Sequence, residues 1–262
     1  MKLGIIIDPD RHGFETAAKY GLSFIEICHN VGRDPDALLD ELPSIKTLCA
    51  ETGIGIGSVG RWGTLKFEDD GAVIEEELKA SRALIDAASD LGSRVFNTGV
   101  NYAGRLTKYE NIVRTMDYLD GLMRYAEPKG VKIAVYNCRW NNYIVSPAEW
   151  EIFHGHLGGL GLKYDASHCI NDGSGDYLGE MRDWGGRFTH VHIKGTVNIG
   201  GQHIDDPPAG IDQIDWGAFM GILYRHGYDG CLSIEPHSGT WSGRLAEPGI
   251  AFTVQYMSKF IL

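Results

Sequence analysis

Three apolar runs in the second half of the chain end in ionisable side chains: Asp165, His192 and Glu235. Two carboxylates and an imidazole that converge in an apolar setting repel one another or are costly to bury alone. A divalent cation removes that cost. Oxygen-rich ligation with one nitrogen suits Mn2+ or Mg2+, with Co2+ or Zn2+ as alternatives. The three residues are therefore predicted to form a metal centre.

The alternation of side chains along a strand supports this convergence. His190 and His192 fall on one face of their run, whereas Val191 and Ile193 fall on the other. If the apolar face packs on helices, both histidines point into the interior. Taken singly, each residue has a structural interpretation: a hydrogen-bonded core histidine, a helix-capping Asp165 or a carboxylate at the rim. Three such residues at neighbouring strand ends favour the metal centre.

Positioning these residues requires parallel strands whose carboxyl ends meet. Short β-branched runs alternate with segments that carry apolar residues at three- and four-residue spacing, which is typical of amphipathic helices. The length of 262 residues is close to the roughly 250 of a (β/α)8 barrel. A doubly wound sheet is the rival, but no GxGxxG follows the first run. We expect an α/β protein, a single-domain (β/α)8 TIM barrel over residues 1–262. The predicted strands are Leu3–Ile7, Ser23–Cys28, Gly55–Val59, Arg94–Thr98, Val131–Tyr136, Leu160–Asp165, Phe188–Lys194 and Cys231–Glu235.

Composition excludes several classes of partner. The net charge of −11, from 35 acidic and 24 basic residues, repels a nucleic-acid backbone. No stretch of about 18 apolar residues occurs, which argues against a membrane span. The five cysteines are an odd number without a CxxC pair, which favours a cytoplasmic location. Barrels of this kind are often oligomeric, so a homo-oligomer is compatible with the sequence.

Three segments carry a family resemblance: residues 161–168, GLKYDASH; residues 189–194, THVHIK; and residues 228–235, YDGCLSIE. They resemble the xylose isomerase-like TIM barrel family (AP endonuclease family 2 type). That family includes sugar isomerases and epimerases, inosose dehydratases and endonuclease IV-type enzymes. Ile214-Asp215-Trp216 is similar as well. The resemblance covers the last four predicted strands well and the first half only through its β/α rhythm.

The resemblance implies a ligand set. Ketose 3-epimerases of this family hold a metal with Glu, Asp, His and Glu on strands five to eight. Asp165, His192 and Glu235 match three of these positions. His168 matches a histidine that contacts a metal ligand or the substrate, and Lys194 matches a frequent lysine.

The fourth ligand position departs from the family pattern. The strand-five motif Glu-Asn-His is replaced by Tyr136-Asn137-Cys138. Tyr136 is expected to ligate weakly as a phenolate, to act as an acid whose pKa a nearby cation lowers, or to pack and leave an open three-ligand site. Lys163 is expected to turn inward beneath Asp165, and an ammonium there would weaken metal binding.

The family default is a metal-dependent isomerase or epimerase that removes a proton next to a carbonyl of a small carbohydrate or polyol. Glu235, or else His168, is the expected general base, and Tyr136 or a water returns the proton. Because only one of the family's two glutamates remains, a lyase acting by elimination is the alternative, like inosose dehydratases or C-glycoside deglycosidases. A non-catalytic sugar-binding barrel is the third interpretation.

Further polar and aromatic residues follow the predicted strands, and ordinary loop packing is the expected role of most of them taken singly. For Trp62 and Trp140 the functional alternative is stacking on a sugar face or on an aromatic aglycone. In the helix before residue 160, His154 and His156 are expected to face solvent. The expected substrate contacts are Glu26, Lys194, Arg139, Asn97 and His203.

Overall fold

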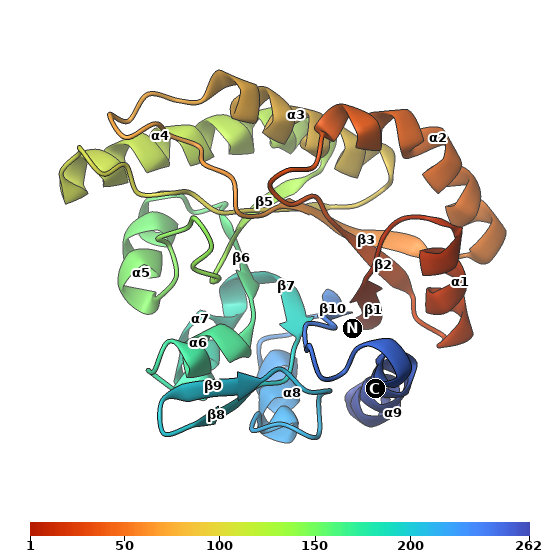
Figure 1. Ribbon diagram of the computed structural model, residues 1–262. Helices are drawn as coiled ribbons and strands as arrows, with labels where there is room; N and C mark the ends of the chain where they lie inside the picture. The colour runs from red at the N-terminus through yellow and green to blue at the C-terminus, as the bar shows by residue number, and fades with distance from the viewer.

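Eight parallel strands close into a barrel in the computed structural model, which describes residues 1–262 (Figure 1). Their order around the barrel is β1-β10-β7-β6-β5-β4-β3-β2. The predicted (β/α)8 TIM barrel is confirmed, and each predicted strand is found with bounds that differ by at most two residues. The strands are β1 Lys2–Ile6, β2 Phe24–Cys28, β3 Gly55–Arg61, β4 Val95–Thr98, β5 Lys132–Tyr136, β6 Gly161–Tyr164, β7 Phe188–Ile193 and β10 Cys231–Ile234.

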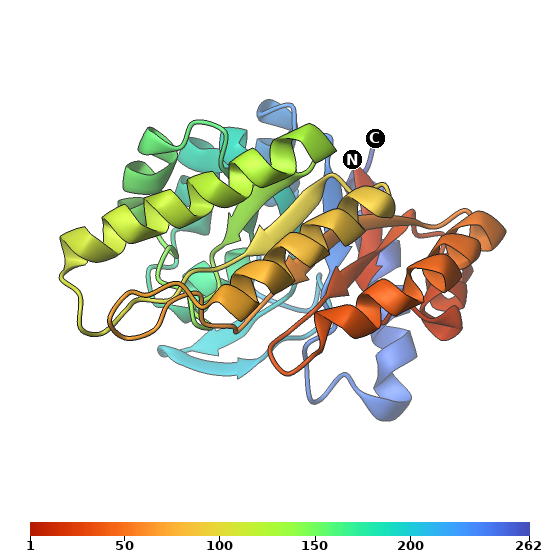
Figure 2. The ribbon, with the colours of Figure 1, turned by 90° about the horizontal axis from the view of Figure 1, so that it is seen from above.

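Helices surround the barrel, and they bury one apolar stripe each against it; in α3 that stripe includes Leu84, Ile85 and Ala88. Figure 2 shows α2, α3 and α4 side by side along the outside of the strands. None of the helices combines the length and apolar character that a membrane crossing requires. The helices are α1 Arg11–Lys19, α2 Pro35–Thr52, α3 Glu75–Asp90, α4 Lys108–Ala126, α5 Pro147–His156, α6 Ala166–Asn171, α7 Tyr177–Trp184, α8 Trp216–Arg225 and α9 Ala246–Met257. Short 3-10 turns cover Glu127–Lys129, Gly185–Arg187, Gly243–Leu245 and Ser258–Phe260.

A small antiparallel hairpin, which is not among the elements predicted from the sequence, follows β7. Its strands are β8 Val197–Ile199 and β9 Gln202–Asp205. Gly200 and Gly201 join them, both at positive φ (62° and 81°), which is the backbone of a tight two-residue hairpin turn. The Gly-Gly pair was the sequence signal for this hairpin. The hairpin carries His203 toward the carboxyl end of the barrel.

Glycines make room for aromatic rings on one inner wall of the barrel. A Cβ at Gly60 would overlap the Trp62 ring, and a Cβ at Gly99 would overlap the Tyr136 ring. Trp62 and Tyr136 stack on each other, with ring centroids 5.5 Å apart. The glycines therefore fix where this pair of rings can lie.

Replacing Gly99 by alanine is expected to lower the free energy of unfolding by roughly 1–3 kcal/mol, because the added methyl group overpacks the wall against Tyr136. Gly121→Ala is the matched control: Gly121 lies in α4 with no atom near its missing Cβ, so alanine there is neutral or stabilising. Urea unfolding of the two variants measures the difference. Equal stabilities would contradict this packing.

His154 is buried, with 1% of its surface exposed, so the expected solvent-facing position is wrong. Its Nδ1–H donates to the Leu160 carbonyl (3.2 Å), and its ring lies near Trp184, because α5 is covered by the following segments. His156 is exposed as expected. Burial lowers the pKa of His154 to about 4.

Stability is therefore expected to fall as the solution is acidified. Since the folded-state pKa of His154 lies below the unfolded value, the unfolded chain binds more protons between those two values, and lowering pH favours unfolding. The loss reaches at most about 2 kcal/mol at about pH 5. Urea unfolding at about pH 7 and pH 5 should show a smaller drop for His154→Gln than for the wild type. Equal drops would mean that His154 does not titrate as a buried group.

Candidate metal and substrate site

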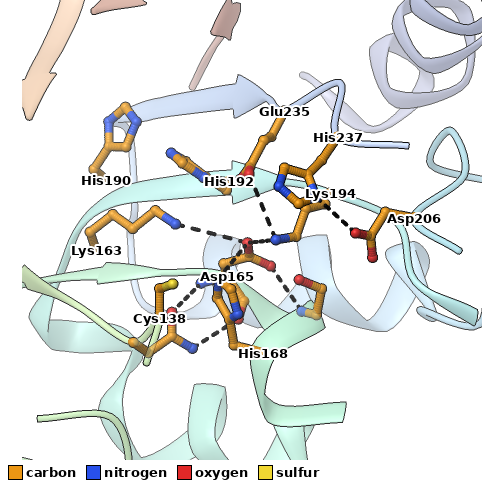
Figure 3. Close-up of polar contacts among 12 residues, drawn as sticks. Cys138, Lys163, Asp165, His168, His190, His192, Lys194, Asp206, Glu235 and His237 are labelled. Carbon is orange, nitrogen blue, oxygen red and sulfur yellow. Dashed lines mark hydrogen bonds and ion pairs between the residues drawn. The ribbon is translucent and has the colours of Figure 1, made fainter. Parts of the chain in front are cut away.

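Asp165, His192 and Glu235 converge at the carboxyl ends of β6, β7 and β10 (Figure 3). One ligand atom from each lies within 4.8 Å of the others. His192 Nδ1 is 2.7 Å from Glu235 Oε2. Asp165 is fully buried and His192 almost so, whereas 18% of the Glu235 side chain is exposed. Strand alternation thus predicted a real cluster, and Glu235 is its member most open to solvent.

The two carboxylate oxygens of Asp165 have different environments. Oδ1 accepts from the Ser167 N–H (2.9 Å) and caps α6. Oδ2 is buried without a hydrogen-bond partner and faces the centre of the cluster. Asn137 fixes the backbone of Asp165 by donating to its carbonyl (2.8 Å) and accepting from its N–H (3.1 Å). Asp165 therefore caps α6 with Oδ1 and presents Oδ2 to the cluster without a hydrogen bond.

Two lysines direct their ammonium groups at the same carboxylate (Figure 3). Lys194 Nζ lies 3.4 Å from Asp165 Oδ2 and 3.7 Å from Glu235 Oε1, and Lys163 Nζ lies 3.9 Å from Asp165 Oδ2. Burial alone would raise the pKa of Asp165, but Lys194, then His168 and Lys163, hold it well below its usual range. Burial also opposes ionisation of Glu235, whose pKa Lys194 and His192 keep low. Both carboxylates are ionised at neutral pH.

His168 borders the same cluster on the side of α6. Its Nε2 is 3.4 Å from Asp165 Oδ2, and 21% of its side chain is exposed. Burial, together with the charge of Lys194, lowers the pKa of His168 to about 3. The imidazole is therefore neutral at physiological pH, and together with Glu235 it is available to a molecule that enters the mouth.

Tyr136 is turned away from the ligand cluster. Its hydroxyl donates to the Trp140 carbonyl (3.3 Å) and accepts from the Gly63 N–H (3.4 Å). Burial raises the pKa of Tyr136. Trp62 lies between Tyr136 and His192, with its ring 6.4 Å from the imidazole. Tyr136 thus packs as part of an aromatic wall beside the cluster.

Three of the predicted substrate contacts, Glu26, Asn97 and Arg139, lie in different places. Glu26 is fully buried beneath the mouth, where the pKa-raising effect of burial is outweighed by His190 and His192. Asn97 is also buried and donates to Ser58 Oγ (3.2 Å). Arg139 pairs with Asp172 at the surface (2.6 Å). The structure places Glu26 in contact with His192 from below (3.1 Å) and keeps Asn97 and Arg139 away from the cluster, so the role of all three as substrate contacts stays a prediction.

His203 belongs to a second group of hydrogen-bonded polar residues, together with Asp206 and His237. Of these three, only His203 was a predicted site residue. Asp206 lies between two imidazoles, 2.8 Å from His203 Nε2 and 3.0 Å from His237 Nδ1. Ser238 Oγ donates to Asp205 Oδ1 (2.6 Å). These contacts tie the β8–β9 hairpin to the loop after β10. His237 lies two residues after Glu235 in the sequence, and this proximity was the signal that could have identified it as a residue near the site.

A buried ionic network joins β3 and the segment after it to α3. Arg61 donates to both Glu77 oxygens (3.1 and 3.0 Å), and Lys66 Nζ donates to Oε1 (2.6 Å). Thr64 Oγ1 donates to the same oxygen (2.8 Å). Lys66 and Glu77 are both buried, and burial lowers the pKa of Lys66 to about 8. This network holds the segment that follows β3, in which Trp62 lies.

The donor set fits a divalent cation. Asp165 Oδ2 is buried without a hydrogen bond, although the Lys194 ammonium lies 3.4 Å away, and His192 and Glu235 each offer one further donor atom to the cluster. Two carboxylates with one imidazole are ligands that Mn2+ and Mg2+ accept. The ammonium groups of Lys163 and Lys194 compete for the same negative charge, so they weaken cation binding relative to a site without them.

Comparisons with known proteins cover nearly the whole chain. The family model described as xylose isomerase-like TIM barrel matches residues 14–256. No curated protein matches the chain significantly by sequence. D-psicose 3-epimerase from Clostridium cellulolyticum H10, solved with D-tagatose, superimposes with a TM-score of 0.80 at 16% identity, covering 100% of this chain and 99% of that one.

Two further solved structures have the same fold. D-allulose 3-epimerase from Methylomonas sp. has a TM-score of 0.76 at 18% identity, with 100% of this chain and 98% of that one covered. The 3-keto-D-glucoside 4-epimerase from E. coli has a TM-score of 0.72 at 16% identity, with 99% of both chains covered. At such identities the likeness establishes the fold alone.

Proposed function

This chain belongs to the xylose isomerase-like TIM barrel family, and we propose that it is a metal-dependent isomerase or epimerase of small carbohydrates or polyols. The observation that carries the proposal is the convergence of Asp165, His192 and Glu235 at the carboxyl ends of three neighbouring strands. In (β/α)8 barrels the active site lies at that end. The similarity in fold to sugar epimerases supports the same class of substrate.

We propose Mn2+ or Mg2+ as the ion, held by Asp165, His192 and Glu235. When bound, the ion supplies a Lewis acid that polarises a carbonyl and an adjacent hydroxyl of the sugar, which makes the neighbouring C–H more acidic. The ligand atoms are fixed in advance, because Asn137 clamps Asp165 and the strands fix the other two residues.

Glu235 is the proposed general base. It is ionised, partly exposed and at the edge of the cluster, so it is the carboxylate that a substrate C–H can approach. Lys194, 3.7 Å from Glu235 Oε1, places a positive charge beside the proposed base, where it would stabilise negative charge that develops on a bound substrate. His168 is neutral and lies beside Asp165, so it can form a hydrogen bond with a substrate hydroxyl.

Elimination is the second candidate, and one observation favours it. The residue at the position of the family's first glutamate is Tyr136, whose hydroxyl is engaged by Trp140 and Gly63 rather than directed at the cluster. A single base suffices for elimination when the leaving group departs with help from an acid, whereas epimerisation must return the proton to the opposite face. For epimerisation in this site, a water would have to return the proton to the opposite face.

Product analysis in deuterated water tests the proposal and separates the two reactions. The protein, supplied with Mn2+, is incubated with a panel of ketohexoses and 3-oxo-glycosides and followed by NMR. Epimerisation or isomerisation gives an isomeric sugar that carries deuterium at the carbon next to the carbonyl. Elimination gives an unsaturated ketone and a released alcohol, aglycone or water. Binding of panel members without deuterium exchange would instead support a sugar-binding barrel.

A further inference from the structure

We propose that Lys163 and Lys194 form a carboxylate-binding subsite, so that the substrate is a small sugar acid whose carboxylate lies next to the reacting carbonyl. The inference rests on the proposed function and deepens it, because it names the class of carbohydrate that the same mouth accepts. It also gives Lys163 a role other than competition with a cation. Lys163 lies on β6, and Lys194 directly follows β7.

The ammonium groups of the two lysines have few acceptors within the protein. Lys163 Nζ forms a single ion pair, 3.9 Å from Asp165 Oδ2, and no hydrogen bond. Lys194 Nζ lies 3.4 Å from the same oxygen and 3.7 Å from Glu235 Oε1, and both contacts are ion pairs rather than hydrogen bonds. An ammonium group carries three donors and no acceptor, and burying it without hydrogen bonds is costly. The lysines therefore offer donors to a ligand that brings acceptor oxygens.

Both lysines are buried along their stems, with 1% of the Lys163 side chain and 5% of the Lys194 side chain exposed. Figure 3 shows their ammonium groups on two sides of Asp165. Glu235 and His168, which border the same cluster, are 18% and 21% exposed and form its open edge. A ligand that enters at this edge meets the ammonium groups at the depth of the proposed metal centre. Its acceptor group must therefore lie close to the carbonyl that the ion would polarise.

The formal charges of the cluster favour a ligand with one negative charge. Two ammonium groups stand with three carboxylates, those of Glu26, Asp165 and Glu235. With neutral imidazoles, a bound divalent cation leaves one positive charge in excess. A carboxylate balances that charge, whereas a neutral sugar leaves it buried without a partner and a phosphate dianion exceeds it. The subsite therefore fits a sugar acid better than a neutral sugar or a sugar phosphate.

The competing interpretation is that the lysines act only on the negative charge that develops on a neutral substrate during the reaction. Lysines in that role would raise the rate but would not distinguish a sugar acid from a neutral sugar in the ground state. The affinity of matched compounds, measured apart from turnover, separates the two interpretations.

Titration calorimetry of the protein supplied with Mn2+ compares 2-keto-D-gluconate, D-fructose and D-fructose 6-phosphate. The first two share a carbon skeleton and a carbonyl, and differ in whether the first carbon is a carboxylate or a hydroxymethyl group. We expect the acid to bind about 10–100-fold more tightly than fructose, as expected for one or two hydrogen bonds between charged groups. Lys163→Met, which keeps an apolar stem without the charge, should remove most of this preference and leave the affinity for fructose nearly unchanged.

Lys132→Met is the matched control. Lys132 is an exposed lysine at the amino end of β5, so its loss changes the net charge equally but away from the mouth, and the preference should remain. Equal wild-type affinities for the acid and for fructose would overturn the inference, and that comparison requires no variant to fold. A preference that Lys163→Met retains in full would also overturn it, because the carboxylate would then bind elsewhere, as on the ion itself.

Two further outcomes separate this inference from the proposed function. Tighter binding of fructose 6-phosphate than of the acid would overturn the carboxylate subsite and leave the proposed function standing. A wild type that binds Mn2+ and the acid with the expected preference, yet exchanges no deuterium, would refute the isomerase and confirm the subsite. If the wild type binds no Mn2+, the positive charge in excess is lost and both are refuted.

Discussion

Replacing Glu235 by glutamine is expected to lower turnover by about 10²–10⁴-fold, the range typical when a general acid–base group is removed. The amide keeps the size of the side chain but cannot take up the proton. The rate is measured as deuterium incorporation next to the carbonyl of whichever panel sugar the wild type converts fastest. Metal content is measured on the same sample.

The matched control is Glu247→Gln on α9. Glu247 is an exposed carboxylate that pairs with Lys19 (2.6 Å), so its loss should leave the rate unchanged. If Glu235→Gln retains its cation and also exchanges deuterium at the wild-type rate, the base lies elsewhere. His168 would then be the residue to replace next.

Replacing Glu77 by glutamine is expected to lower the free energy of unfolding by about 3–5 kcal/mol, because it leaves two buried cations without their carboxylate. Arg61 and Lys66 are both buried and both donate to Glu77. Burial favours the neutral form of Glu77, but its hydrogen bonds from Arg61 and the charge of Lys66 hold its pKa below the usual value. Urea unfolding at neutral pH measures the loss.

The neighbouring residue provides a control for this variant. Glu76 is exposed on the same turn of α3, and Glu76→Gln should change stability by no more than about 0.5 kcal/mol. If Glu77→Gln were as stable as Glu76→Gln, the network of Arg61, Lys66 and Glu77 would contribute nothing to the stability of the fold. The segment after β3 that carries Trp62 would then not depend on this network.

Strand periodicity predicted both the barrel and the ligand cluster for the same physical reason. Side chains alternate between the two faces of a strand, so the apolar partners of His192 identified the inward face, and polar ends on parallel strands meet at one edge. Asp165 and Glu235 follow their strands directly, and the structure places both beside His192. Lys163 likewise faces Asp165 as expected.

The depth of a side chain in the barrel could not be predicted in this way. Alternation gives the face of Glu26 but not its height, which depends on the stagger between strands across the barrel. That stagger places Glu26 level with His190 and His192 rather than at the mouth. The direction of the Tyr136 hydroxyl depends on contacts with Gly63 and the Trp140 carbonyl, which no strand pattern encodes.

Loop residues were missed for a related reason. His237 and Asp206 lie in segments without periodicity, and they meet only because the β8–β9 hairpin folds back toward β10. His154 was placed on the wrong face because a short helix covered by other segments has no solvated side at that position.

Metal content tests the central claim most directly. The wild type, Asp165→Ala and His192→Ala are purified, supplied with Mn2+, freed of excess ion and analysed for bound elements. About one Mn, Mg, Co or Zn per wild-type chain is expected, as three ligands from one chain form one site, with little in either variant. A wild type that stays metal-free after Mn2+ addition would contradict the metal centre. Lys163 and Lys194 would then be the only cations beside Asp165.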